Sequence, residues 1–171
     1  MPFEFTYEGT LEGANEYFAL RLHQEWTGKP ELDQEKALQA ATNAINALVY
    51  AGVKASVYTL LANNPDATDE EIAAAEAEQE FEFPRDDQET VPTDVEIAIY
   101  EEAHELIRGR DPEQEFANLA LSSGGVGSTR DSIDTLASPQ HICNGILSFI
   151  AWRYLKPYIA DNNNFRVVRV S

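Results

Sequence analysis

The sequence predicts a mainly α-helical fold, a bundle of about five to six helices with a Gly/Ser-rich loop and an extended C-terminal tail. Three observations support this prediction. Apolar residues recur at spacings of three and four in several segments, those segments are bounded by capping residues and by Gly or Pro, and only the last residues alternate like a strand. With 43% hydrophobic and 25% charged residues, the chain has the composition of a folded domain.

The first two helices are predicted over residues 10–26 and 33–49. Thr10 and Asp33 are residue types that accept hydrogen bonds from free N–H groups at the start of a helix, so we expect them to be the caps. Gly52 is expected to end the second helix.

Residues 54–90 differ from the rest of the chain and are predicted to be an acidic insertion in the domain. A short helix is expected to end before Pro65. Thr68 followed by Glu71 forms a capping box, which opens a helix rich in alanine and glutamate. This helix has almost no apolar face beyond Ile72, so we expect it to be exposed to solvent or packed against a neighbouring chain.

The second half of the chain predicts three more helices. A capping box at Thr93 opens one over about 94–108, Pro112 begins another, and the most apolar one spans 139–159. The Gly/Ser/Thr-rich stretch 122–138 is predicted to be a loop with one short β element.

Residues 1–160 are therefore expected to form one helical domain, and residues 161–171 an extended tail. The tail is apolar, basic and prone to β structure, and two interpretations stay open. It is either a strand packed on its own domain or a segment that docks on a partner.

The net charge excludes several functions. The chain has 12 Lys+Arg against 30 Asp+Glu, a formal charge of −18, which disfavours gripping DNA or an anionic membrane. No segment approaches the roughly 18 apolar residues of a membrane span, and we expect no signal peptide. Residues 66–105 contain 16 of the acids and one basic residue, Arg85. This cluster is either a solvated face or a surface that repels or mimics a polyanion.

Three patterns raise the possibility of chemistry. Glu101-x-x-His104 is half of a carboxylate di-iron motif, but no second pair exists, so we interpret Glu101, Glu102 and Glu105 as a solvated face with His104 near its edge. Residues 124–129 lack the lysine of a phosphate-binding loop. Cys143, the single cysteine, lies on the apolar face of a predicted helix and is expected to be a buried, inert thiol. We therefore expect no enzyme, no metal and no cofactor.

Four stretches together resemble the head–tail connector (adaptor) proteins of long-tailed bacteriophages. Each stretch alone is weakly specific, but their order and spacing are moderately specific. Together they cover most of the chain. They are Tyr17–Leu22 with Trp26 and Lys36–Leu48, then Phe83-Pro84-Arg85 with Val91–Val95, then Gly124–Thr129, and finally Tyr154–Ile159. The chain departs from the family pattern in its longer, more acidic segment 54–82 and in its extension past residue 160.

The resemblance implies a structural virion protein made in the bacterial cytoplasm and located in the neck between capsid and tail. Its copies would form a ring, commonly twelvefold, below the portal protein. The ring would bind a tail-completion, stopper or terminator protein on its other side. Genomic DNA would pass through without specific binding. Some relatives carry a single-stranded DNA-binding label, which the lack of a basic groove disfavours here.

Two sets of residues are the expected sites. Acidic candidates for lining or rimming the channel are Glu76, Glu78, Glu80 and Glu82. Candidates for binding the portal or a neighbouring subunit are Phe165, Arg166, Val167, Val168, Arg169 and Val170. A small acidic DNA mimic and a generic helical interaction module remain alternative functions.

Overall fold

The computed structural model describes residues 5–21, 24–120, 125–126, 129–130 and 139–160, and in these residues the fold is mainly helical, as predicted. The helices are α1 (Leu11–Ala19), α2 (Gln24–Thr27), α3 (Glu31–Asn46), α4 (Ala55–Asn63), α5 (Asp69–Glu78), α6 (Thr93–Ile107), α7 (Pro112–Ala120), α8 (Gln140–Cys143) and α9 (Phe149–Leu155). Two short strands, β1 (Gly125–Val126) and β2 (Thr129–Arg130), pair in antiparallel fashion.

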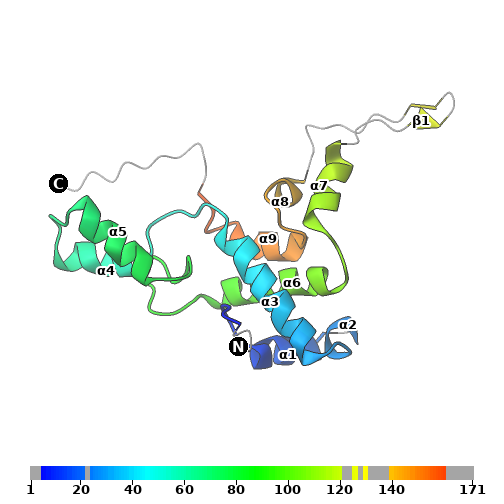
Figure 1. The fold of residues 1–171 in the computed structure, drawn as a ribbon, viewed down its shortest axis with the longest axis horizontal. Coiled ribbons are helices and arrows are strands. Elements are labelled where there is room, and N and C mark those ends of the chain that lie inside the picture. Colours follow the sequence, from blue (N-terminus) through cyan, green and yellow to red (C-terminus); the bar gives the residue numbers. More distant parts are fainter. Residues whose placement is uncertain (1–4, 22–23, 121–124, 127–128, 131–138, 161–171) are drawn as a thin grey trace.

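Helices α3, α6 and α9 form the centre of the body, with α6 packed between the other two (Figure 1). The small helices α1 and α2 cover one end of this layer. Fully buried apolar side chains of α3, α6 and α9 form the core between these helices, among them Leu38, Ile45, Val95, Ile99 and Leu155. Each such side chain contributes about 1.5–3 kcal/mol when it leaves water. This burial is what holds the body together.

The predicted helix 10–26 is wrong as a single helix, because α1 ends at Ala19 and α2 begins at Gln24. The Thr10 cap is confirmed, since its hydroxyl accepts from the N–H of Gly13 at 2.9 Å. The separate α2 places Trp26 against Phe18, with ring centroids 4.9 Å apart, and the Trp26 indole N–H donates to Asn15 at 2.8 Å.

The predicted caps Asp33 and Thr93 are both wrong, because a proline takes the N-cap position in each helix. α3 begins after Pro30 and α6 begins after Pro92, and each proline has the extended backbone of a cap residue. Asp33 and Thr93 therefore lie inside the first turn and are not the N-cap residues of these helices. The second helix also ends earlier than predicted, at Asn46.

The predicted helix 139–159 is interrupted at Gly145, whose φ of 78° lies in the left-handed region that favours glycine. The chain then turns so that Ile142 and Ile146 are buried. Cys143 is exposed, so its prediction as a buried thiol is wrong. Ser148 caps the new helix α9 by accepting from the N–H of Ala151 at 3.1 Å.

Helices α4 and α5 form a hairpin that stands beside the body, at the left of Figure 1. We call residues 54–90, which contain this hairpin, the acidic arm. Within the described residues, no helix is long and apolar enough to cross a membrane.

Candidate functional site

The acidic arm is the most unusual surface of the chain, and its second helix is fixed by local interactions. The predicted capping box is confirmed. The N–H of Glu71 donates to the Thr68 hydroxyl at 3.3 Å, and the N–H of Thr68 donates to the Glu71 carboxylate at 2.8 Å. No residue of α5 is buried, and its half-buried positions include Ile72. Helix α4 packs against α5 and buries Val57.

The outer face of α5 is a stripe of small and acidic residues. Glu70, Ala73, Ala74 and Ala77 are all exposed, and their spacing of i, i+3, i+4 and i+7 places them on one side of the helix. Glu78 is exposed beside this stripe. An exposed alanine face with flanking carboxylates contributes nothing to the chain's own core, so it is available for contact with another molecule.

The four predicted channel-facing glutamates fall into two groups. Glu76, Glu78 and Glu80 are exposed, and among the described residues no cation pairs with their carboxylates. Glu82 is half-buried, with its carboxylate 2.5 Å from Arg85 and 3.6 Å from Lys54. The first three carboxylates face solvent, whereas Glu82 holds the arm together.

Arg85 is the joint between the arm and the body. Its guanidinium is buried and donates to the carbonyl oxygens of Ala51 at 2.9 Å, Gly52 at 2.7 Å and Glu82 at 3.3 Å. Together with the Glu82 carboxylate this gives the planar, always charged side chain four acceptors, as burial of an arginine requires.

Gln79 and Lys54 complete the joint. The Gln79 side-chain amide donates to Phe81 O and Pro84 O, both at 2.9 Å, and its oxygen accepts from the N–H of Ser56. Lys54 donates to Gln79 O at 2.9 Å. These contacts link both helices of the arm to the segment that returns to the body.

Phe83 anchors the same segment in the core. It is 2% exposed, and its ring contacts Tyr50 and Tyr158 at centroid distances of 4.8 and 5.4 Å. The Phe83-Pro84-Arg85 stretch, one of the four that carry the family resemblance, is therefore a structural joint. Its sequence signal was Arg85, the single basic residue in the acidic cluster.

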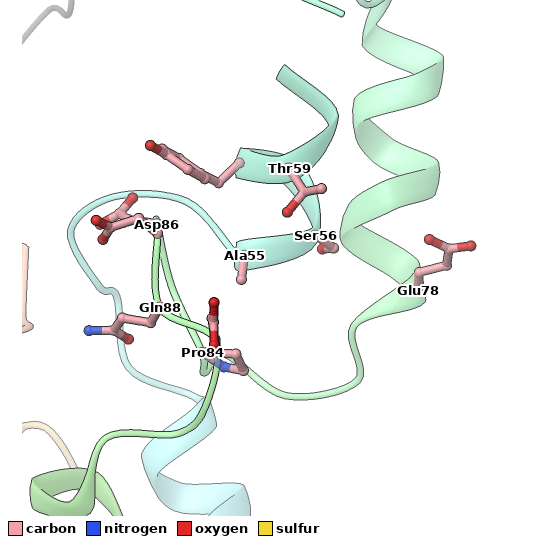
Figure 2. A pocket seen from close by; sticks show the side chains of 10 residues that line it. Ala55, Ser56, Thr59, Glu78, Pro84, Asp86 and Gln88 are labelled. Carbon is pink, nitrogen blue, oxygen red and sulfur yellow. The ribbon is translucent and has the colours of Figure 1, made fainter. Parts of the chain in front are cut away.

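A groove of about 570 Å³ lies between the start of α4 and the turn that follows Pro84 (Figure 2). Four carboxylates line it and no basic side chain does. Its lining residues are Ala55, Ser56, Tyr58, Thr59, Glu78, Pro84, Asp86, Asp87, Gln88 and Glu89. Asp86 is held by the N–H of Val53 at 3.0 Å. Such a groove repels phosphate and other anions.

The prediction that Glu101, Glu102 and Glu105 form a solvated face with His104 near its edge is wrong, because Glu101, Glu102 and His104 are buried and Glu105 is half-buried. The Glu102 carboxylate accepts from the N–H groups of Leu147 at 3.0 Å and Ser148 at 2.9 Å, which ties α6 to the start of α9. Burial raises the pKa of Glu102, although these N–H groups oppose the shift.

Glu101 and His104 have separate partners and do not form a metal site. Glu101 pairs with Arg21 and accepts from the Tyr17 hydroxyl at 2.5 Å. His104 packs on Phe18, with ring centroids 5.2 Å apart. In the described part of the chain, no group of three or more His, Cys, Asp or Glu side chains could hold a metal ion.

Glu105, beside His104, lies in a second charged cluster at the end of α6. Hydrogen bonds from His104 and Arg110, together with the charge of Arg108, lower its pKa to about 2. The contacts of Arg108 and Arg110 with Glu105 hold the end of α6.

Two predicted features cannot be placed. The partner-binding candidates Phe165, Arg166, Val167, Val168, Arg169 and Val170 lie outside the described residues. Of the stretch 124–129, only residues 125–126 and 129 are described, and they belong to the β1–β2 pair.

Comparison of the chain with protein-family models, curated proteins and solved structures found no match.

Proposed function

We propose that this chain is a head–tail connector (adaptor) subunit of a long-tailed bacteriophage. Copies of it form a ring below the portal protein, extend the DNA channel and join the capsid to the tail. The observation that carries the proposal is the acidic arm, a helical hairpin with solvent-facing carboxylates fixed to a helical body by the Arg85 joint.

The arm suits a channel through which DNA must slide without binding. Phosphate groups are repelled by Glu76, Glu78 and Glu80, whose carboxylates have no cation beside them among the described residues. The Arg85 joint keeps these charges at a fixed position relative to the body. A ring of twelve would carry on the order of −200 formal charges, which counterions must largely screen.

The family resemblance supports the same assignment and names the partners. One face of the ring meets the portal protein, and the other meets a tail-completion, stopper or terminator protein. The protein supplies no chemistry in this role and needs no cofactor. Its place is the neck of the virion.

The test is complementation of phage particles that lack the chain. DNA-filled heads produced without it should fail to join tails, and adding the purified wild-type protein should restore infectious particles. Heads that join tails equally well without the protein would contradict the proposal.

A charge-reversed arm tests the channel role separately. E76K/E80K should still join heads to tails but should slow genome ejection, because DNA would now stick to the channel. The matched control E12K/E16K reverses two exposed acids of the body and should eject normally. Equal ejection rates for both variants would show that the arm does not face the DNA.

An acidic DNA mimic is the second candidate, favoured by the four carboxylates that line the arm groove. A mimic would act as a monomer or dimer that binds a DNA-binding enzyme, and it would not complement defective heads.

A further inference from the structure

Most cations of this acidic chain are paired with carboxylates, and a few are not. Of the nine Lys and Arg side chains that the structure describes, six have a carboxylate partner: Arg21, Lys36, Lys54, Arg85, Arg108 and Arg110. Lys29, Arg153 and Lys156 have none within the described residues. Arg153 and Lys156 lie one turn apart at the end of α9, and both are exposed.

These two cations line a groove together with aromatic side chains. Phe149, Trp152, Arg153 and Lys156 follow the spacing i, i+3, i+4 and i+7, so they share one face of α9. They line a groove of about 520 Å³ with Pro139, Gln140 and His141 from the start of α8. Phe149 is 59% exposed, which is unusual for a phenylalanine.

The groove's charge comes from the two cations. Burial lowers the pKa of His141, which favours the neutral imidazole, and its ring contacts Phe149 with centroids 5.6 Å apart. An occupant that fits must therefore combine negative charge with a small, apolar contact surface for Phe149.

The outer face of α5 has both the negative charge and the small apolar surface that the groove requires, and its residues also follow the spacing i, i+3, i+4 and i+7. Ala73, Ala74 and Ala77 would let an aromatic ring approach the helix closely, and Glu70 and Glu78 flank them. Figure 1 shows α5 at one side of the molecule and α9 within the body, so one chain does not fill its own groove. A second copy can supply the helix.

We propose that the α5 helix of one copy docks in the α8–α9 groove of the next copy. Phe149 would pack on the alanines, while Arg153 and Lys156 would pair with Glu70 and Glu78. The contact joins two different surfaces, so it is head-to-tail and closes into a ring when the rotation permits. The inference rests on the proposed function, for which it names the subunit interface.

Nucleic acid is a poorer occupant for this groove. Two unpaired cations on a chain of charge −18 would neutralise too few phosphates for stable binding. The alanine stripe of α5 would also remain without a contact.

Charge reversal on each side tests the interface. R153E/K156E reverses the groove, and E70K/E78K reverses the helix. The matched controls are K29E/K36E and E12K/E16K, which make the same net charge changes at other exposed positions. Association of the full-length chains is measured by sedimentation velocity at up to about 1 mM protein and from about 50 to 500 mM salt, a range that spans strong and weak screening.

We expect the wild-type chain and both controls to associate into species larger than a dimer. Each groove or helix variant alone should associate at least about tenfold more weakly, because like charges then face each other. An equimolar mixture of the two variants should regain association, since each reversed surface meets its reversed partner, and rising salt should weaken it.

Three results would overturn the interface. They are a wild-type chain that stays monomeric under all conditions, variants that associate like their controls, and a mixture that stays monomeric. If the wild-type chain binds DNA and R153E/K156E loses this binding without any change in self-association, the groove would be assigned to nucleic acid instead.

Head complementation separates this inference from the proposed function. If R153E/K156E and E70K/E78K each join heads to tails normally, the interface is wrong while the connector function stands. If the mixture restores association but the wild-type chain never joins heads to tails, the interface stands and the connector function fails.

Discussion

The body and the acidic arm use the same residue type in opposite ways. In the body, Glu101 and Glu102 are buried and fully occupied with holding helices together. In the arm, Glu76, Glu78 and Glu80 face solvent with no cation beside them in the described residues. The net charge of the chain therefore does not describe one acidic surface. It combines carboxylates that build the fold with carboxylates that are free to act on other molecules.

The largest expected effect breaks this comparison in the body. Glu102→Ala should lower the free energy of unfolding by about 3 kcal/mol, because the buried N–H groups of Leu147 and Ser148 lose their acceptor. Chemical denaturation measures the change. The matched control Glu76→Ala in the arm should change stability by less than about 0.5 kcal/mol. Similar losses for both variants would contradict the division between body and arm.

The joint between the two regions should give the next largest effect. Arg85→Ala removes the donor for three carbonyl oxygens and the partner of Glu82. The substitution should therefore lower the free energy of local opening of the arm by about 2–3 kcal/mol. Hydrogen exchange should then accelerate in residues 54–90 while α3 and α6 remain protected. Lys36→Ala, which removes an exposed pair with Asp33, should leave the arm unchanged. Uniform acceleration across the chain would show that the arm does not open on its own.

A pH-dependent effect concerns Glu8, a buried carboxylate of the body that has no cation beside it among the described residues. Burial raises the pKa of Glu8 from 4.5 to about 7, and the charges of Glu82 and Glu96 add to the shift. Because the folded chain holds this proton more tightly than the unfolded chain does, its stabilising contribution is complete below pH 4.5 and is lost as the pH rises to about 7.

Glu8→Gln should remove this pH dependence. Relative to the wild type, the variant should be about 3 kcal/mol more stable at pH 8 and nearly equal at pH 4.5. Denaturation curves at the two pH values provide the measurement. A difference between wild type and variant that is the same at both pH values would contradict the assignment.

The predictions from sequence succeeded where the interaction is local. The Thr68–Glu71 capping box depends on residues three apart, and it is present. The exposure of α5 follows from its lack of an apolar face and is equally local. Thr93 and Asp33 failed as caps because the preceding prolines already have the extended backbone that a cap needs, so the helices begin earlier than the capping residues suggest.

The remaining features depend on contacts between distant parts of the chain. Glu102 is buried because its acceptor oxygens meet N–H groups 45 and 46 residues away. Arg85 reaches carbonyl groups 33 and 34 residues away. Both contacts join residues more than 30 positions apart, so the sequence around Glu102 or Arg85 cannot predict them. From their local sequence, both residues are expected to be ordinary surface charges. The groove on α9 was hidden in the same way, because the predicted continuous helix 139–159 placed no break before Phe149.

The central claim is that this chain assembles as a connector ring on a portal, and native mass spectrometry of the two purified proteins tests it most directly. With a twelvefold ring, the portal should gain about 230 kDa, which is twelve times the chain mass of 19.1 kDa. A portal that gains no mass, or only one or two copies, would contradict the account.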